Sequence, residues 1–262
     1  MMETEVKISD LLDVAAEAKK NCIDREHSLK ITEKGFANYV TEVDVKVQKF
    51  IEEKLKERYP SIQFMGEEKN NDDIDFTKPV WILDPVDGTS NLIHDLQNSV
   101  ISLALYSGQE LTMGVVCHLF ADEVYYAQKG QGAYLNGRPI HVSSTDEFSK
   151  SLISIGTSPY FKELADDNFD AFKKIFQNCE DIRRIGSAAL DLAYVAAGRL
   201  EAYLEKRLNP WDYAAGVLLV TEAGGAVTDY CGGPVDVTKT ADIFAGNGII
   251  DKKIRRELLH WE

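Results

Sequence analysis

The feature that most constrains this chain is the run W-I-L-D-P-V-D-G-T-S at residues 81–90. An apolar, β-prone stretch from Val80 to Leu83 ends at the carboxylate of Asp84, and Asp87 follows three residues later. A glycine and two hydroxyl residues then open the next segment. This order predicts a buried strand that ends in two acids beside a turn rich in backbone N–H donors. Such a site can hold divalent cations and a phosphate together.

The same run is compatible with two different roles. Asp-Pro and Asp-Gly are common turn pairs, so D-P-x-D-G can also be an ordinary surface turn. Phosphatases with an aspartyl nucleophile carry D-x-D-G-T after a strand, but here one extra residue separates the acids, and the run lies far into the chain. The strand before Asp84 and the Gly88-Thr89-Ser90 segment after Asp87 favour the site over the turn.

Charge and composition restrict the ligands. With 29 Lys and Arg against 43 Asp and Glu, the formal net charge is −14. An acidic chain repels a phosphate backbone, so we expect no nucleic acid partner. The same sign repels an anionic substrate unless metal ions invert the local field.

The segments that would indicate secretion or a membrane are missing from the pattern. Residues 1–7 lack the apolar core of a signal peptide. No apolar run approaches the roughly 20 residues that span a bilayer. The four cysteines form no C-x-x-C pair and are expected to be reduced thiols. We therefore expect a cytoplasmic protein with no membrane partner.

Apolar periodicity predicts the first elements. Apolar residues recur at helical spacing from Ile8 to Ala15, which predicts an amphipathic helix over about 4–25. Residues 26–40 look irregular. Thr41-Glu42-Val43-Asp44 resembles a capping box. The apolar stripe that follows predicts a second helix, which ends at Pro60.

The rest of the chain alternates strand and helix signals, with Asn136-Gly137 as a tight-turn signal. The predicted strands are 62–65, 80–83, 100–106, 111–120, 123–128, 200–204 and 243–245. The predicted helices are 166–178, 187–197, 211–223 and 251–259, the first with Phe169, Phe172 and Phe176 on one face. No repeat or linker is visible, so we expect one domain over residues 1–262 with a layered α/β or α+β architecture.

Each of the remaining acids, taken alone, fits an ordinary structural role. Gly66-Glu67-Glu68 can be a solvated turn, although a strand that ends in two acids can also supply a metal ligand. Asp212 stands at a predicted helix start, where Asp is usually a cap. Asp44 fits the capping box, and Ser187-Ala188-Ala189 fits an ordinary helix start.

The combination of these motifs changes the interpretation. Four motifs occur in an order and spacing that resembles the inositol monophosphatase family: G-E-E at 66–68, W-I-L-D-P-V-D-G-T-S at 81–90, G-S-A-A at 186–189 and W-D-Y-A-A-G at 211–216. The resemblance implies a five-layered α-β-α-β-α sandwich and a single catalytic domain, usually assembled as a homodimer. It also implies Mg²⁺-dependent hydrolysis of small phosphate monoesters, with two to three ions per site. Mn²⁺ is expected as a substitute, and Li⁺ and Ca²⁺ are expected to inhibit.

The resemblance also implies roles for individual residues. Asp84 would bridge two metal ions, and a third, mostly hydrated ion would face Glu67. The implied metal ligands are Glu67, Asp84, the Val86 carbonyl, Asp87 and Asp212. The amides of Gly88 and Thr89 would cradle the phosphate. Thr89, hydrogen-bonded to Asp44, would orient and help deprotonate the attacking water, so that Glu67, Thr89 and Asp44 form the catalytic set.

The leaving alcohol is less defined by the resemblance. A carboxylate at Glu205, the backbone near Ala188 and Asp87 would contact it, and Arg184 would lie near the sugar, from this chain or its partner. Many animal members of the family have a histidine where this chain has Asn209, so the substrate preference stays open. The first hypothesis is hydrolysis of myo-inositol monophosphate or a similar phosphorylated polyol or sugar.

Two alternatives to that hypothesis remain. The substrate can instead be fructose 1,6-bisphosphate, 3′-phosphoadenosine 5′-phosphate, NADP or histidinol phosphate. Asp84 follows Glu67 by only 17 positions, which leaves little room for a second phosphate site and favours monophosphates. A mainly regulatory, protein-binding role is the second alternative.

Overall fold

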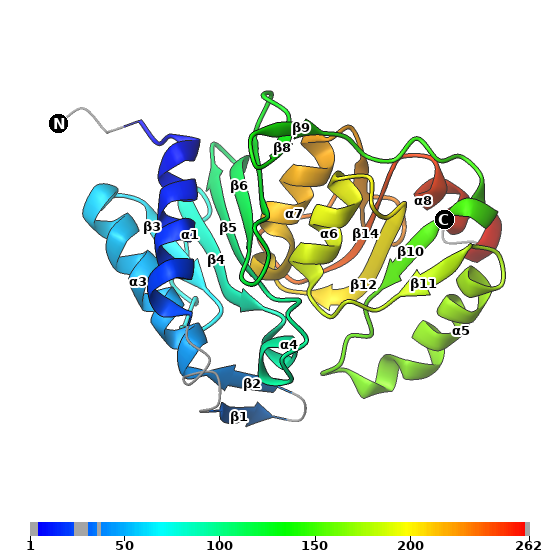
Figure 1. Cartoon of the computed structure of the whole chain (residues 1–262), viewed down its shortest axis with the longest axis horizontal. Helices are drawn as coiled ribbons and strands as arrows, with labels where there is room; N and C mark the ends of the chain where they lie inside the picture. The colour runs from blue at the N-terminus through cyan, green and yellow to red at the C-terminus, as the bar shows by residue number, and fades with distance from the viewer. Residues whose placement is uncertain (1–4, 24–30, 36–37, 260–262) are drawn as a thin grey trace.

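A computed structural model describes residues 5–23, 31–35 and 38–259 of the chain. Five layers follow one another across the molecule (Figure 1). Helices α1 and α3 form one outer layer, a seven-stranded sheet the second, helices α6 and α7 the third, a five-stranded sheet the fourth, and α5 with α8 the fifth. Three clusters of buried apolar side chains fill the spaces between the layers. The predicted α-β-α-β-α sandwich is confirmed.

The first outer layer is amphipathic, as the apolar stripes predict. Helix α1 (Ile8–Cys22) and helix α3 (Glu42–Arg58) bury one side each against the sheet, where Trp81 and Leu83 belong to the same cluster. The helix predicted over 4–25 is shorter than expected, and residues 4, 24 and 25 lie outside the described part. The capping box is present at the start of α3, since the Thr41 amide donates to the Asp44 carboxylate at 2.9 Å and the Thr41 hydroxyl accepts from the Val43 amide.

The prediction that residues 26–40 are irregular is wrong for the residues that the structure describes, because these form two strands. Strand β1 (Ile31–Gly35) pairs with strand β2 (Asn38–Thr41) in an antiparallel arrangement, with Thr32 opposite Val40. Residues 26–30, 36 and 37 lie outside the described part. Strands this short carry too few alternating positions for periodicity to detect. The pair lies next to α4 at one edge of the molecule (Figure 1).

The second layer is a sheet in the order β3-β4-β5-β6-β7-β8-β9, with β3 parallel to β4 and the other pairs antiparallel. Asn136 and Gly137, both with positive φ, make the predicted tight turn between its last two strands. The strands are β3 (Gln63–Gly66), β4 (Val80–Asp87), β5 (Val100–Ser107), β6 (Glu110–His118), β7 (Val124–Gln128), β8 (Ala133–Leu135) and β9 (Arg138–Ile140).

Strand β4 does not end at Asp84 as predicted. It continues to Asp87, with all eight residues buried between two helical layers. Asp84 lies opposite Ser102 and Asp87 opposite Val100, so β4 carries one extra residue at this point. This β-bulge accommodates Pro85, which has no amide to donate to the ladder. The bulge brings both carboxylates to the same end of the strand.

The third layer is almost wholly apolar because it is covered on both sides. Ser187 caps helix α6 (Ala188–Ala196), as predicted, and its hydroxyl accepts from the Leu190 amide. Helix α7 (Pro210–Glu222) packs beside it (Figure 1). A Cβ at Gly114 of β6 would lie 3.1 Å from Cα of Ala215, so the sheet and α7 approach closely.

The fourth layer is a sheet in the order β11-β10-β12-β14-β13. Its central strand β12 runs to Leu208 and is longer than the predicted 200–204. The strands are β10 (Leu152–Ile155), β11 (Asp181–Arg183), β12 (Ala202–Leu208), β13 (Ala226–Thr228) and β14 (Ala241–Gly246).

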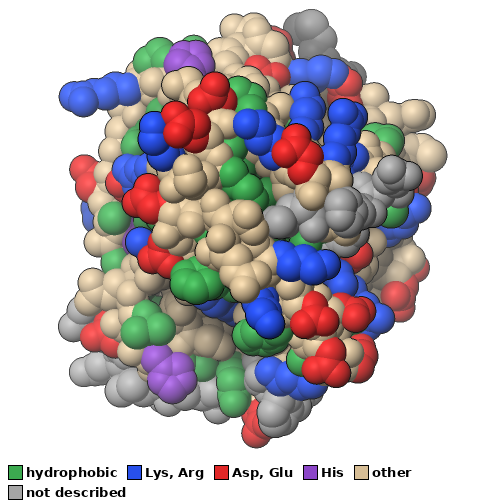
Figure 2. All heavy atoms as spheres, turned by 90° about the vertical axis from the view of Figure 1, so that its right-hand side faces the viewer, with side chains coloured by type: hydrophobic (Ala, Val, Ile, Leu, Met, Phe, Trp, Pro, Cys, Tyr) green, Lys and Arg blue, Asp and Glu red, His purple; other side chains and the backbone are tan. Residues whose placement is uncertain are grey.

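The last layer covers this sheet with helix α5 (Ala165–Phe176) and helix α8 (Ile250–Lys253). Of the three phenylalanines predicted on one face of α5, only Phe172 is buried, whereas Phe169 and Phe176 are 61% and 55% exposed. On the face that looks out from this side, basic and acidic side chains are interspersed (Figure 2). The remaining short elements are α4 (Thr89–Ile93), η1 (Phe148–Lys150), η2 (Lys162–Leu164) and the π-helical turn η3 (Ile254–Leu259).

None of the helices in the described ranges has both the length and the apolar character needed to cross a bilayer.

Candidate active site

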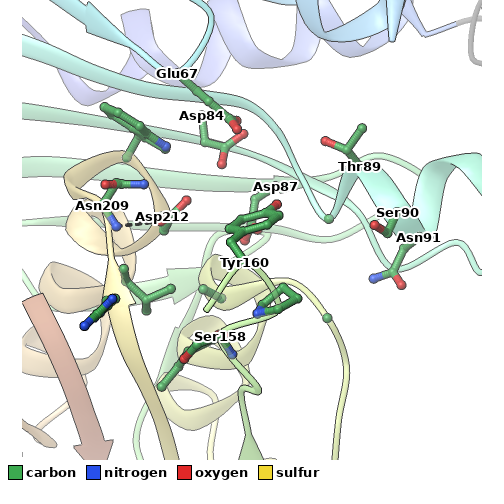
Figure 3. A pocket seen from close by; sticks show the side chains of 18 of the residues that line it. Glu67, Asp84, Asp87, Thr89, Ser90, Asn91, Ser158, Tyr160, Asn209 and Asp212 are labelled. Atoms are coloured by element: carbon green, nitrogen blue, oxygen red, sulfur yellow. Dashed lines mark hydrogen bonds between the residues drawn. The ribbon is translucent and has the colours of Figure 1, made fainter. Parts of the chain in front are cut away.

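A pocket of about 520 Å³ opens where both sheets and the middle helices meet. Ten of the eleven predicted site residues line it; Asp44 is the exception and lies buried behind Thr89. Carboxylates from the ends of β3 and β4 and from the start of α7 face one another across the pocket (Figure 3). The predicted residues that line it are Glu67, Asp84, Val86, Asp87, Gly88, Thr89, Arg184, Ala188, Glu205 and Asp212.

Asp84 is buried among the other carboxylates of the pocket. Its side chain is 2% exposed, and Oδ1 accepts from the Val86 amide at 2.9 Å. Burial raises the pKa of Asp84 well above its usual range, and repulsion from Glu67, then Asp87 and Asp212, raises it further. A carboxylate so placed favours any positive charge that enters the pocket.

Asp87 is held by the start of α6. Its Oδ2 accepts from the Ser187 hydroxyl at 2.7 Å and from the Ala189 amide at 2.6 Å. Burial nevertheless outweighs these bonds and raises the pKa of Asp87 to about 6. The carboxylate is therefore fixed in place, while the cost of its charge remains only partly offset.

Asp212 is both a helix cap and a pocket residue. It is the third residue of α7, and its Oδ2 accepts from the Asn209 amide at 2.6 Å, as in a capping box. Burial and then repulsion from Glu67 and Asp87 raise its pKa well above the usual range. The cap suggested by the sequence is present, and it does not exclude a role in the pocket.

The donor set fits hard divalent cations, although the side chains are not gathered around one point. Within the described residues, no three His, Cys, Asp or Glu side chains form a cluster of metal-ligand spacing. The carboxylates Glu67, Asp84, Asp87 and Asp212 nonetheless share one pocket, and repulsion among them contributes to the raised pKa values. Carboxylate and carbonyl oxygens are the ligands that Mg²⁺ prefers, and its charge would offset this repulsion.

Thr89 connects the pocket to a buried carboxylate. Its hydroxyl lies 2.9 Å from Oδ1 of Asp44 and 3.1 Å from the Val86 carbonyl, and its single proton can be donated to one of them at a time. Asp44 is fully buried and also accepts from the Thr41 amide at 2.9 Å and from the Thr41 hydroxyl. The predicted Thr89–Asp44 contact is thus present, with Asp44 anchored by the cap of α3.

Gly88 shapes the turn that precedes Thr89. Its φ is +92°, and a Cβ there would lie 2.8 Å from the Asn98 carbonyl oxygen. A side chain at this position would be strained in both respects. Glycine therefore allows the chain to turn sharply from the end of β4 into α4, and both Gly88 and Thr89 line the pocket.

On the opposite wall, Glu205 is buried and engaged. Its Oε1 accepts from the Ser158 amide at 2.8 Å, and its Oε2 accepts from the Tyr203 hydroxyl at 2.7 Å. A Cβ at Gly156 would lie 2.1 Å from the Glu205 carboxylate, so only glycine leaves room for it. Arg184 lines the same wall of the pocket, and its Nη2 lies 3.4 Å from the Thr157 hydroxyl.

Sequence reasoning missed the loop 156–161, which supplies Ser158 and Tyr160 to the pocket. Its only local signals are Gly156 and Pro159, which indicate a loop and no chemistry. Tyr160 stands among the carboxylates (Figure 3). Although the residue is 53% exposed, its hydroxyl end lies in the acidic pocket, where partial desolvation and then the charges of Glu67 and Asp212 raise its pKa.

A five-layered α-β-α-β-α fold with an acidic pocket at the start of α4 is typical of one class of phosphatases. The chain belongs to the inositol monophosphatase family, whose model matches residues 3–260. This membership supports a phosphatase activity, in a family that is generally metal-dependent.

Individual relatives agree with the family assignment. The chain is 35% identical over 235 residues to an inositol-1-monophosphatase of Bacillus subtilis, which covers 89% of this chain and 88% of that protein. The extragenic suppressor protein suhB from Bartonella henselae superposes with a TM-score of 0.88 at 34% identity, over 95% and 96% of the two chains. The inositol monophosphate-bound SaIMPase-II superposes with a TM-score of 0.82 at 30% identity, over 96% and 92%.

Proposed function

We propose that residues 1–262 form one catalytic domain that hydrolyses small phosphate monoesters with Mg²⁺, with myo-inositol monophosphate as the preferred substrate. The single observation that carries this proposal is the pocket that Glu67, Asp84, Asp87 and Asp212 share with the start of α4. The binding of inositol monophosphate to the similar SaIMPase-II supports the choice of substrate.

The carboxylates divide between two ions in this proposal. Glu67, Asp84 and the Val86 carbonyl would hold one, and Asp84, Asp87 and Asp212 would hold the other, with a third near Glu67. Bound Mg²⁺ would supply a water of lowered pKa and neutralise charge on the phosphate oxygens. The raised pKa values of Asp84 and Asp212 support cation binding by these acids, because both need a counter-charge to ionise.

The chain's own groups position the reactants. The amides of Gly88 and Thr89 would bind phosphate oxygens at the start of α4. The Thr89 hydroxyl would accept a hydrogen bond from the attacking water while donating to Asp44, which lies 2.9 Å away. Asp44 is held by Thr41, so this pair fixes the direction of attack at little cost in reorganisation.

The leaving alcohol would occupy the space bounded by Ala188, Arg184 and Glu205. Glu205 already accepts from Ser158 and Tyr203, and a carboxylate oxygen has a second lone pair for a substrate hydroxyl. Asp87 reaches the same region through its contact with the start of α6. We expect Arg184 to contact the polyol from this chain or from the partner in a homodimer.

The test is phosphate release from a panel of monophosphates and bisphosphates, with and without Mg²⁺, Mn²⁺, Li⁺ and Ca²⁺. We expect inositol 1-phosphate to be hydrolysed with Mg²⁺ and, more slowly, with Mn²⁺, and its hydrolysis to be inhibited by Li⁺ or Ca²⁺. Asp84→Asn should lower kcat by at least about a thousandfold, while Asp170→Asn on the exposed side of α5 should not. Activity without metal, or an active Asp84→Asn variant, would contradict the mechanism. Efficient cleavage of a bisphosphate or nucleotide with inositol 1-phosphate ignored would contradict the substrate.

A further inference from the structure

Tyr160 places a large, exposed aromatic side chain in the pocket. Its side chain is 53% exposed although it lines the cavity, and Figure 3 shows the ring projecting toward the carboxylates. The other exposed large apolar side chains of the described residues, such as Phe169, do not line the pocket. An apolar ring face left in a polar pocket is an unused contact surface for a ligand.

The loop that carries Tyr160 is built rigidly. Ser158 is 3% exposed and takes a φ of +48°, which is uncommon for a residue with a side chain. Two contacts to β12 hold it there: its amide donates to Glu205 at 2.8 Å and its hydroxyl donates to the Lys206 carbonyl at 2.9 Å. Phe161 then closes the turn, since its amide donates to the Ser158 carbonyl at 2.9 Å.

The far end of the loop is clamped as well. The guanidinium of Arg207 stacks on the ring of Phe161, 4.6 Å from its centroid, and also pairs with Glu163 at 3.0 Å. The backbone of Arg207 is itself fixed, because its amide donates to Asp242 at 2.9 Å. Tyr160 therefore stands between two anchored neighbours, which fix the position of its backbone at the edge of the pocket.

The position of the loop indicates which part of a substrate the ring would meet. Thr157 contacts Arg184, and Ser158 contacts Glu205, so the loop spans the two residues assigned to the leaving alcohol. The phosphate would lie on the opposite side, at the start of α4. Tyr160 therefore lies between the carboxylates of the pocket and the wall formed by Glu205 and Arg184, and its ring borders the space in which the alcohol would bind.

We propose that Tyr160 is a specificity-determining residue whose ring face packs against the ring of the leaving alcohol. This inference rests on the proposed function. A cyclic polyol or sugar presents a face of C–H groups, which packs well on an aromatic ring, whereas an acyclic alcohol such as glycerol covers little of it. Tyr160 thus selects ring-shaped leaving groups over acyclic ones, while Glu205 and Arg184 would form hydrogen bonds with the hydroxyls of the alcohol.

The experiment measures KM and kcat for inositol 1-phosphate and for glycerol 2-phosphate in the presence of Mg²⁺. Tyr160→Ala should raise KM for inositol 1-phosphate about five- to tenfold, with KM for glycerol 2-phosphate changed less than about twofold. Tyr160→Phe keeps the ring and should resemble the natural protein. Tyr160→Leu keeps apolar bulk, secures the comparison if the alanine variant is unstable, and should lie between the two. Phe169→Ala removes an exposed aromatic side chain outside the pocket and should leave KM unchanged for both substrates.

Each outcome supports or overturns the role of the ring. An equal rise in KM for both substrates, or no rise for either, overturns it. A loss in Tyr160→Phe as large as that in Tyr160→Ala overturns it too, because the hydroxyl would then be the contact. If the natural protein hydrolyses neither monophosphate, the proposed function fails, and this result is distinguishable from hydrolysis that is indifferent to Tyr160.

Discussion

Neutralising Asp87 should stabilise the metal-free protein at alkaline pH. The carboxylate is 8% exposed, and its pKa of about 6 in the folded chain compares with an ordinary value of 3.8. Between these two values the folded state holds a proton that the unfolded state has lost, so stability falls as the pH rises through this window. This difference in pKa lowers the free energy of unfolding by about 3 kcal/mol once the pH is above 6, and roughly half of the loss develops between pH 5 and pH 8.

The assay is urea unfolding of the EDTA-treated protein at pH 5 and pH 8. Asp87→Asn should raise the free energy of unfolding by about 2–3 kcal/mol at pH 8 and by about half as much at pH 5. The amide oxygen of asparagine can still accept from Ser187 and Ala189, so the position loses its charge and keeps these bonds. Asp170→Asn on α5 serves as the control.

Two results would refute this reasoning. A variant that is less stable than the natural protein at pH 8 would show that the charge of Asp87 is well compensated without metal. A stabilisation of the same size at both pH values would show that the effect is not one of titration. Saturating Mg²⁺ supplies a further check, because it should favour the natural protein and reverse the order of stability.

Three further predictions concern the surroundings of the site. Thr41→Ala removes the cap of α3 and one hydrogen bond to Asp44, so it should lower the free energy of unfolding by about 1–2 kcal/mol and reduce kcat more than it changes KM; urea unfolding and phosphate release measure the two effects. Gly114→Ala would place a Cβ 3.1 Å from Cα of Ala215 and force β6 and α7 apart, which should cost about 1–3 kcal/mol in the same unfolding assay. Mg²⁺ should raise the melting temperature of the natural protein, and thermal unfolding of Asp84→Asn should show little or no rise.

The fold was most predictable where one short segment shows both its secondary structure and whether it is buried. The unbroken apolar run before Asp84 indicates a strand covered on both sides, and β4 is buried along its whole length. Ser187 begins α6 as a cap, and Asn136-Gly137 makes its turn. The end of β4 was mispredicted, because a bulge is defined by the partner strand and leaves no periodic signal.

The site was predictable to the extent that its residues lie in motifs. The loop 156–161 was not, because its place in the pocket depends on contacts with residues far along the chain. Ser158 reaches Glu205, 47 residues further on, and nothing near Ser158 in the sequence indicates this contact. Tyr160 enters the pocket only as a consequence of that anchor. A residue of this kind is found from the structure, since neither periodicity nor capping rules describe it.

The two acids that first looked like helix caps show why a structural role did not exclude a functional one. Asp44 and Asp212 each occupy the third position of a helix, where one carboxylate oxygen accepts from the amide of the capping residue. The bond uses one oxygen and fixes the side chain, so the other oxygen points in a set direction at no further entropic cost. In Asp44 that second oxygen accepts from Thr89, and in Asp212 the second oxygen is left for the pocket that the carboxylate lines. The cap therefore preorganises the acid, and replacing either residue by alanine should lower kcat in the phosphate-release assay, even where removal of the buried charge offsets the loss of the helix cap in stability.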